Sequence, residues 1–516
     1  MTLLPRQAGE GQSKSYAFLE LDFPGPGSPG QGEGGRFSLE LSFDSENTVQ
    51  LPLALYDPAS RLRFTKASEP ARGRVSLSYS FDAYPGDCED NAGPWKLVLH
   101  KRILGESLSI RLVPGFQAVP EGKALYEAAS KGTAPSEAVP LQGCGEPPLA
   151  FDSAVLDPRP GWYCGELHLH SHMSTGRTDI RTIRAAALEQ GLDFLALTDH
   201  FTPYHWQGIE ALGARGEKPL FLRSAEVAGD KGHANLHGLA SWPDPFPDDE
   251  DGAVQAFLGR KVCRTMEEAA DFVHSQSGLF CLNHPLSAGV SWRYEDFPLQ
   301  KADLIETACL PDGPVSFLYP TLWDRLLCQG LKPFAVGSSD SHDPNHKGPW
   351  ALGVIRNWVY ASSLSREGIL AGFKAGRAYV AIGPARLDFT AQVLGAGKGP
   401  GAVASMGQTI RMGREDRAVF NASLRNHPSG NLFIYKDGLL LETKSLGAAP
   451  APESGPDSAS SRVVFEASGK DIRPGGSFFR LEFHEDLEKA AYHGMAYRDH
   501  RSLRVLSNPI FLEAMA

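Results

Sequence analysis

The chain has 516 residues, of which 42% are hydrophobic, and a formal net charge of −11. This length predicts more than one domain, and we expect three, while the acidic balance argues against nucleic acid as a partner because nucleic-acid-binding domains present clustered basic side chains. Seven cysteines lack CxxC spacing, which argues against a disulfide framework or an all-cysteine zinc site, and no apolar run is long enough for a signal peptide or membrane helix, so we expect a cytoplasmic protein without a membrane partner.

Residues 1–150 are predicted to form an N-terminal β-sandwich. Runs such as SYAFLELDF, which starts at Ser15, and WKLVLH, which starts at Trp95, alternate apolar and polar residues as half-buried strands do. Segments rich in Gly, Pro and Asp separate these runs. No ligand-type side chains cluster here, so we interpret the region as an accessory packing domain; a carbohydrate- or partner-binding module is the alternative.

Residues 151–384 alternate strand-like and helix-like runs, which indicates an α/β barrel or wound sheet. Apolar residues at helical spacing predict a helix from Ile180. A T-x-x-E capping box predicts a second helix from Thr265, and a third begins near Ser365 and ends at Gly376. The strand-like runs between them are FLALT, LFLRSAEV, GLFCLNH, ADLIETA and PFAVGSSDSH.

Residues 385–516 return to an all-β pattern. The runs RLDFTAQV, AVFNASLR, LFIYKD, RVVFEAS and SFFRLEFHE are separated by loops such as APAPESGPDSAS. Such short, regularly spaced strands predict a second, C-terminal β-sandwich.

Possible metal ligands stand at the ends of the strands of the middle region. His168 and His170 form an HxH pair, whose imidazoles lie on one side of a strand and can share a metal ion. The carboxyl ends of parallel strands gather at one edge of a sheet or barrel, so the later ligands should meet this pair. The candidate ligands are His168, His170, His200, Glu226, His233, His284, Asp340 and His342.

This set of side chains predicts divalent metal. Imidazoles mixed with carboxylates suit Zn²⁺, Mn²⁺ or Fe²⁺. One catalytic zinc takes about three protein ligands, so eight convergent candidates predict two or three ions that activate water for hydrolysis. Each histidine taken alone is more often an ordinary core or surface residue, and Asp199 could serve only to orient His200.

Several segments together resemble the PHP superfamily, named for polymerase and histidinol phosphatase. They are GWYCGELHLHSHMSTG, LALTDH, GHANLHGL, AVGSSDSH, AGFKAGRAYVAIGP and SNPIFL, and within the superfamily they are most similar to the carbaryl-hydrolase-like metallohydrolases. The resemblance covers about Gly161 to Pro384 and implies a distorted (β/α)7 barrel with a trinuclear metal site. The implied ligands are His168, His170, His200, Glu226, His284, Asp340 and His342, with His233 as an eighth.

One departure from the family pattern leaves the third ion open. Relatives usually carry Asp-Gly after the HSxxS run, whereas this chain has Thr175 and Gly176. Asp179 is the alternative source of the missing carboxylate. The expected cofactors are therefore two or three ions of Zn, Mn or Fe.

The resemblance implies a phosphoesterase acting on a small phosphomonoester or phosphodiester. Asp199 and Arg177 are the predicted catalytic residues, and Arg177 is the best candidate for a fixed phosphate-binding cation because it follows the HxH strand. A carbamate or carboxylic ester is an alternative substrate, with Trp206 and Trp292 among the aromatics that could line its site. A metal-containing binding protein without turnover is the other alternative. The oligomeric state stays open.

Overall fold

The computed structural model describes part of the chain. Between residues 6 and 118 it describes the strands β1 (Arg6–Gln7), β2 (Tyr16–Phe23), β3 (Gly35–Val49), β4 (Pro52–Tyr56), β5 (Leu62–Ala67), β6 (Ala71–Ala83), β7 (Gly93–His100) and β8 (Arg111–Ala118). Beyond them it describes residues 149–200, 204–213, 215–229, 231–241, 265–288, 290–309, 318–345, 351–395, 400–449, 460–486 and 502–515.

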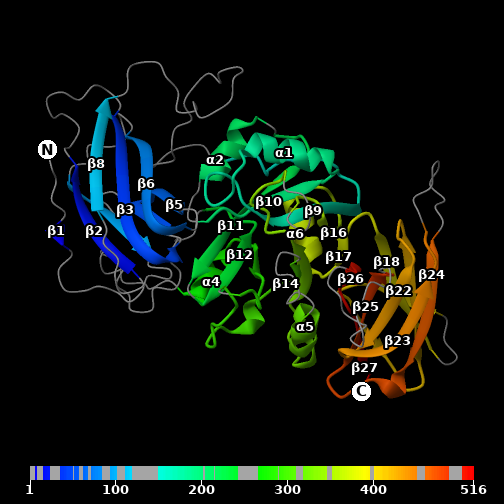
Figure 1. The fold of residues 1–516 in the computed structure, drawn as a ribbon. Helices are drawn as coiled ribbons and strands as arrows, with labels where there is room; N and C mark the ends of the chain where they lie inside the picture. Colours follow the sequence, from blue (N-terminus) through cyan, green and yellow to red (C-terminus); the bar gives the residue numbers. More distant parts are fainter. Residues whose placement is uncertain are drawn as a thin grey trace.

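The N-terminal strands form two antiparallel sheets. One has the order β1-β2-β7-β4-β5 and the other the order β6-β3-β8. The described elements of this region are strands, as the sequence predicts, and they lie together at one side of the molecule in Figure 1. The packing of the two sheets as a sandwich stays a prediction.

The middle region holds strands and helices in alternation. Its elements are β9 (Gly161–Leu169), α1 (Ile180–Glu189), β10 (Phe194–Leu197), α2 (Tyr204–Ala211), β11 (Leu220–Gly229), β12 (Gly232–His237), α4 (Met266–Ser275), β13 (Leu279–Leu282), η1 (Leu299–Lys301), β14 (Leu304–Cys309), α5 (Tyr319–Cys328), β15 (Phe334–Ser338), β16 (Ile355–Ala361), α6 (Arg366–Lys374) and β17 (Ala378–Ile382).

The three predicted helices are confirmed with their caps. The Asp179 side chain accepts a hydrogen bond from the Thr182 amide at the start of α1. Thr265 and Glu268 form the predicted capping box of α4, and Ser365 caps α6. These caps satisfy amide groups of the first turn, which have no partner within the helix.

Seven strands, β9 to β15, lie beside one another in sequence order. β9, β10 and β11 are mutually parallel, as are β13, β14 and β15, while β12 runs antiparallel to both its neighbours. An isolated parallel bridge between Leu169 and Ser341 joins the two ends of this run. The ends of β9 and β15 therefore meet.

The predicted (β/α)7 barrel is not shown. Gly229 pairs with Gly232 across a tight β11–β12 hairpin, so this connection has no helix and reverses the strand direction. Among the described residues, β13 and β14 are joined by the single 3-10 turn η1 rather than by an α-helix. The observed architecture is a mixed, strand-rich α/β fold in which strict alternation of strand and helix fails at these two places.

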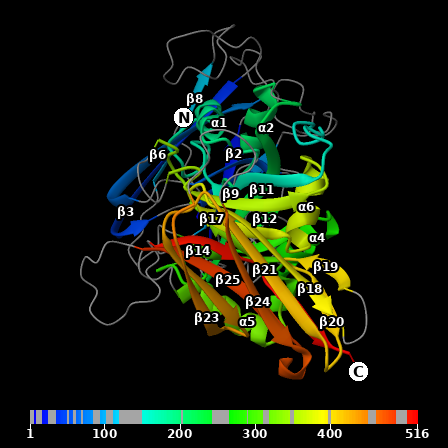
Figure 2. The same cartoon turned by 90° about the vertical axis from the view of Figure 1, so that its right-hand side faces the viewer.

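The C-terminal strands form two layers. They are β18 (Arg386–Leu394), β19 (Pro400–Ser405), β20 (Thr409–Met412), β21 (Arg417–Arg425), β22 (Gly430–Lys436), β23 (Leu439–Leu446), β24 (Ser461–Ser468), β25 (Ser477–Glu485), β26 (Leu503–Ser507) and β27 (Ile510–Ala514), with the turn η3 (Gly469–Asp471). One layer is the sheet β19-β18-β21-β24, and β26-β25-β22-β23 belong to the other. Figure 2 shows these strands from the side. The rings of Phe420 and Phe479 pack across the layers with centroids 4.6 Å apart.

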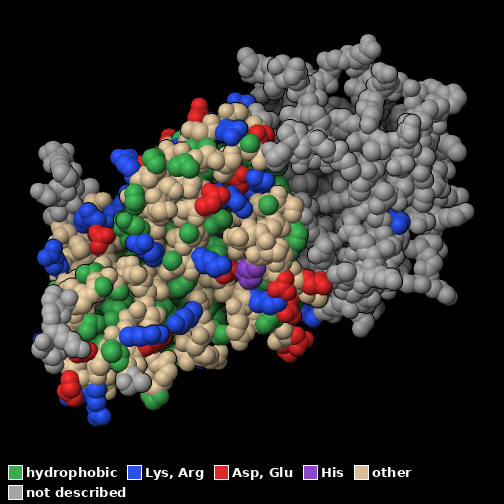
Figure 3. Space-filling view, turned by 180° about the vertical axis from the view of Figure 1, so that it is seen from behind, with side chains coloured by type: hydrophobic (Ala, Val, Ile, Leu, Met, Phe, Trp, Pro, Cys, Tyr) green, Lys and Arg blue, Asp and Glu red, His purple; other side chains and the backbone are tan. Residues whose placement is uncertain are grey.

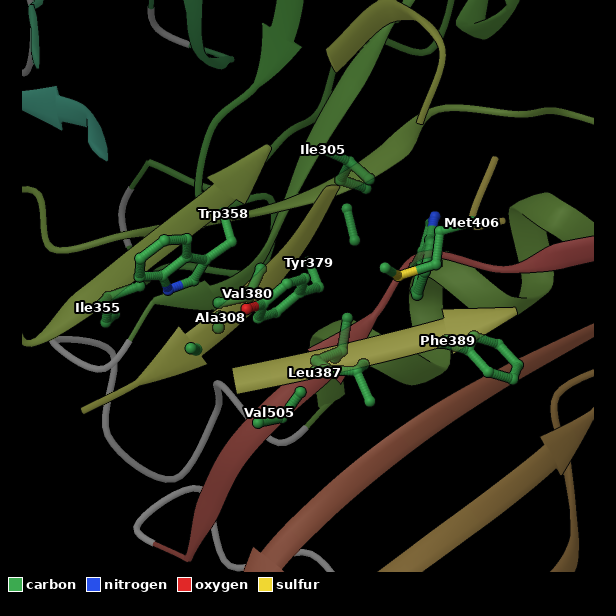
Figure 4. Close-up of a cluster of buried hydrophobic side chains, with 14 of the residues drawn as sticks. Ile305, Ala308, Ile355, Trp358, Tyr379, Val380, Leu387, Phe389, Met406 and Val505 are labelled. Atoms are coloured by element: carbon green, nitrogen blue, oxygen red, sulfur yellow. The ribbon is translucent and has the colours of Figure 1, made fainter. Parts of the chain in front are cut away.

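The second layer is continuous with the sheet of the middle region. β17 pairs with β26, with Tyr379 opposite Ser507, so the main sheet continues past the boundary that we predict at residue 384. The cores merge at the same place, since Ile305, Trp358 and Leu387 belong to one buried cluster that Figure 4 draws across this junction. The C-terminal layers and the middle region thus share both a sheet and a core.

Charged side chains of both signs lie on the surface, whereas several histidines of the middle region are buried. On the face drawn in Figure 3, Lys, Arg, Asp and Glu side chains are interspersed and little histidine is visible. His168, His170 and His284 are all buried. Within the part of the chain that the structure describes, no helix is long and apolar enough to span a membrane.

Candidate metal centre

The parallel arrangement of the strands brings the predicted ligands to one end of the seven-strand run. His168 lies near the end of β9, and His200 follows β10 and forms a parallel bridge with Glu226 of β11. His233 stands at the start of β12. Because β12 is antiparallel, its start lies at the same edge as the end of β11, with His233 opposite Ala228.

The carboxylate of Glu226 is the centre of this cluster. Its Oε2 atom lies 3.2 Å from the Nε2 atoms of His168, His170 and His200 alike. Its Oε1 atom lies 2.9 Å from Nδ1 of His233 and 3.6 Å from Nε2 of His284. Five imidazoles from four different segments of the chain therefore surround one carboxylate.

Asp340 supplies a second carboxylate beside the same histidines. Its Oδ1 atom lies 3.1 Å from Nε2 of His170 and 3.3 Å from Nε2 of His168. Nδ1 of His342 lies 3.8 Å from the same oxygen. All eight predicted metal ligands are thus in one cluster.

The two carboxylates and the imidazoles shift one another's protonation. Burial by itself would raise the pKa of Glu226, but the imidazoles of His200 and His168 hold it well below its usual range. Burial would likewise lower the pKa of His170, but its hydrogen bonds with Asp340 and Glu226 raise it to about 9. In the absence of a bound cation, the carboxylates therefore favour the protonated form of His170.

These residues fit a divalent metal centre. A carboxylate oxygen offers about two lone-pair sites, so Oε2 of Glu226 cannot accept well-formed hydrogen bonds from three imidazoles at once. Three groups have ligand atoms that all lie within 4.8 Å of one another: His168, His170 and Asp340; His168, Glu226 and His284; and His170, His200 and Glu226. Imidazole nitrogen and carboxylate oxygen are also the donors that Zn²⁺, Mn²⁺ and Fe²⁺ accept.

Backbone strain marks two of the ligands. His284 has φ 25° and Asp340 has φ 44°, values in the left-handed region that residues other than glycine seldom adopt. Such strain persists only where the surroundings fix the conformation, and it concentrates at functional sites. Each residue lies two positions after the end of a strand, β13 or β15, where the chain turns.

Sequence reasoning missed Glu306 of β14. Its Oε1 atom lies 2.7 Å from Nδ1 of His168, and its Oε2 atom accepts a 2.6 Å hydrogen bond from the backbone amide of His284. A carboxylate that binds the second nitrogen of a ligand histidine fixes the orientation of the ring. Glu306 is a single Glu inside the strand run ADLIETA, so no local motif pointed to it.

Asp199, a predicted catalytic residue, contacts the loop after β9. Its carboxylate accepts hydrogen bonds from the amide of Ser171 at 2.7 Å and from the hydroxyls of Ser171 and Ser174 at 2.5 and 2.6 Å. The nearest imidazole nitrogen of His170 lies 4.0 Å away. This geometry favours a role in holding the loop behind His170, and a catalytic role stays a prediction.

Arg177 and Asp179 lie outside the cluster. The backbone amide of Arg177 donates a 2.7 Å hydrogen bond to the carbonyl of His342, which places the residue beside the site, but its side chain is exposed. Asp179 caps α1, where its carboxylate is 2.8 Å from the amide of Thr182. Asp179 is not a member of any of the three groups of ligands described above.

Of the aromatic side chains proposed for an apolar wall, Trp206 belongs to the core and Trp292 packs against it. Trp206 is buried and donates a 3.0 Å hydrogen bond to the carbonyl of Ser224. Trp292 packs against Phe280 and Phe297. No apolar wall for a carbamate or carboxylic ester follows from these two residues.

Solvent exposure differs among the described side chains of the cluster. The side chains of His168, His170 and Glu226 are at most 1% exposed, whereas that of Asp340 is 21% exposed and that of His342 is 38% exposed. A substrate can therefore approach the cluster from the segment that follows β15.

No family model and no curated protein matches this sequence. A two-domain protein from Bacteroides vulgatus that contains a predicted PHP-like metal-dependent phosphoesterase is similar in structure, with a TM-score of 0.37 and 14% identity over 68% of this chain and 96% of its own. A candidate metal-dependent phosphoesterase from Bifidobacterium adolescentis gives a TM-score of 0.27 and 15% identity over 37% and 90%. An amidohydrolase from Chromobacterium violaceum with bound sulfate gives 0.23 and 19% over 35% and 88%. These low TM-scores establish neither family nor activity, so the function must be argued from the site.

Proposed function

We propose that this chain is a metal-dependent hydrolase of phosphomonoesters or phosphodiesters. The observation that carries the proposal is the position of Glu226, one of whose oxygens lies 3.2 Å from the Nε2 atoms of His168, His170 and His200. Such a buried arrangement of imidazoles around a carboxylate is the donor set of a catalytic metal centre with more than one ion.

The side chains of the cluster would hold and orient the reacting groups. Glu226 lies beside different imidazoles through its two oxygens and would hold divalent metal together with them. Glu306 fixes the ring of His168 through Nδ1, so that Nε2 faces the cluster. Bound divalent ions would lower the pKa of a water molecule toward neutrality and polarise the bond to be hydrolysed.

The open side of the site decides where the ester is bound. Asp340 and His342 are the more exposed members of the cluster. The backbone amide of Arg177 donates a hydrogen bond to the carbonyl of His342. The exposed Arg177 side chain would then bind the phosphate group of an ester that enters beside Asp340 and His342. The phosphoester class itself is favoured by the resemblance of the His168–His170, Asp340–His342 and neighbouring motifs to the PHP superfamily.

A panel of three esters tests the proposal. Bis-p-nitrophenyl phosphate, p-nitrophenyl phosphate and 1-naphthyl carbamate would be offered to the full chain with Mn²⁺ and, in parallel, with a chelator. We expect chelator-sensitive hydrolysis of at least one phosphoester. Hydrolysis of the carbamate alone would support the other ester class, and absent or chelator-insensitive turnover on all three would refute the proposal and favour a binding protein.

A further inference from the structure

The strand that precedes Asp340 and His342, β15, has an edge at which no other strand pairs continuously among the described residues. β15 pairs with β14 on one side, where the Phe334 amide donates to the carbonyl of Asp303. Alternate backbone groups of a strand point to opposite edges, so the N–H and C=O groups of Ala335 and Gly337 face the other side. Buried backbone groups of this kind need partners.

Two asparagine side chains take the place of a partner strand at that edge. The Asn508 side chain accepts a 2.7 Å hydrogen bond from the Ala335 amide through Oδ1 and donates a 3.1 Å bond to the Ala335 carbonyl through Nδ2. Asn357 of β16 makes the same pair of bonds with Gly337, at 2.8 and 2.9 Å. Both asparagines are almost fully buried.

Asn508 also connects β15 with the C-terminal layers. It directly follows β26, and its Nδ2 atom donates a second hydrogen bond, at 2.9 Å, to the carbonyl of Ala378 at the start of β17. β15 packs closely here, since a Cβ atom at Gly337 would lie 2.5 Å from side-chain atoms of Ile355 and Val380. The strand is therefore fixed against β16 and β17 by amide bonds and by close contact.

The strained segment after β15 depends on this attachment. Asp340 lies three residues after Gly337, and its φ is positive. Its backbone amide donates a 3.0 Å hydrogen bond to the hydroxyl of Ser338. On its far side, the carbonyl of Ser341 accepts a 2.8 Å bond from the amide of His170. A shift of β15 would move the Asp340 carboxylate relative to His168 and His170, which lie within 3.3 Å of it.

We infer that Asn508 is a positioning residue for the metal centre, and that through it the C-terminal β-layers hold the Asp340 and His342 side of the site in place. Asn508 acts on the backbone of β15 and does not touch a ligand. The inference rests on the proposed metal centre. It assigns a role to the SNPIFL segment and to the continuity of the sheet across β17 and β26.

The test measures metal binding rather than turnover. Mn²⁺ binding to the chelator-treated full chain would be followed by calorimetry, and the absorption spectrum of the Co²⁺-substituted protein would report ligand geometry. In Asn508→Ala we expect at least one ion to bind about 10- to 100-fold more weakly, as on loss of other residues that orient metal ligands. The Co²⁺ spectrum should change as well.

A variant that only destabilises the C-terminal layers is the matched control. Phe465 of β24 stacks on Phe420 with centroids 4.7 Å apart, in the layer that does not pair with β17. Phe465→Ala should lower the melting temperature but keep the Mn²⁺ affinity and the Co²⁺ spectrum of the wild type. Equal loss of affinity in both variants, or unchanged binding in Asn508→Ala, would overturn the inference.

Two further measurements cover a variant that does not fold. Asn508→Ser is a milder change that shortens the side chain, and the same weakening of Mn²⁺ binding is expected. In the wild type, saturating Mn²⁺ should slow hydrogen exchange at the amides of Ala335 and Gly337, because coupling between metal and strand is reciprocal. Unchanged exchange at both amides would overturn the inference, whereas a wild type that binds no divalent ion would refute the metal centre itself.

Discussion

Two buried clusters of charged side chains differ in how completely their polar groups find hydrogen-bond partners within the cluster. In the C-terminal layers, the Arg480 guanidinium donates to both oxygens of Asp324, at 2.6 and 2.7 Å, and to Glu482 at 2.6 Å. It also lies 4.2 Å over the ring of Tyr435. One fixed cation thus meets two carboxylates in the fork geometry that arginine favours.

The metal-centre cluster has the opposite character. Five imidazoles crowd around Glu226, and the Nδ1 atoms of His170 and His284 have no hydrogen-bond partner among the described residues. Its two strained ligands contrast with the regular strand of Arg480. Burial and charge alone therefore do not mark a functional site. The distinguishing features are buried polar atoms without hydrogen-bond partners among the described residues and strained backbone at the same cluster.

Removal of a central imidazole should have the largest effect. His168→Ala deletes a ligand that lies in two of the three groups able to hold a metal ion. Metal-dependent hydrolysis should fall by more than the roughly 100-fold that loss of an orienting neighbour causes. Circular dichroism should show folded β-layers in the same variant, and full activity on the ester panel would be incompatible with the assigned site.

Removal of the Arg480 guanidinium from its cluster with Asp324 and Glu482 should lower the stability of the fold instead. Arg480→Ala leaves Asp324 and Glu482 buried without their counter-ion, which should cost about 3–5 kcal/mol of the free energy of unfolding. Urea denaturation of the chelated protein would measure this loss. The Mn²⁺ affinity of the folded variant should change little, and a loss of stability below about 1 kcal/mol would contradict the view of a buried, essential pair.

The gathering of the candidate ligands in one cluster could be predicted from the sequence because the pattern is local. HxH, DxH and single ligands follow short apolar runs, and parallel strands bring such ends together without further information. Glu306 was missed because a lone Glu inside a strand has no local signature. The direction of β12 was missed although Gly229 and Gly232 flank a two-residue loop, which is a hairpin signal.

The features that depend on distant contacts could not be predicted. The alternation in SFFRLEFHE predicts the strand of Arg480, but its partner Asp324 lies 156 residues away along the chain. The pairing of β17 with β26, and the amide bonds of Asn508 to β15, 173 residues earlier, are equally non-local. Local patterns therefore give the elements and the ligands, whereas the attachment of the C-terminal layers to the site needs the structure.

The stability of the metal-free protein should depend on pH through the protonation of His170. Hydrogen bonds with Asp340 and Glu226 raise the pKa of His170 to about 9 against burial, so its charged form stabilises the chelated fold below the unfolded value near 6.5. This contribution is lost as the pH rises through about 9. Saturating Mn²⁺ should reduce or reverse the fall, because metal competes with protons for the imidazoles. Equal pH slopes in urea denaturation with and without Mn²⁺ would argue against a metal site.

The smallest effect is expected at Asp179, the residue that could have replaced the missing carboxylate of the PHP pattern. In the structure its side chain caps α1 through a 2.8 Å bond to the Thr182 amide. Asp179→Ala should therefore cost about 1 kcal/mol of stability, as loss of a helix cap does, and leave the number of bound Mn²⁺ ions unchanged. Asp179→Ser retains a capping hydroxyl but no carboxylate, so it should recover the stability. Fewer bound ions in both variants would show instead that the Asp179 carboxylate reaches the metal and completes a third site.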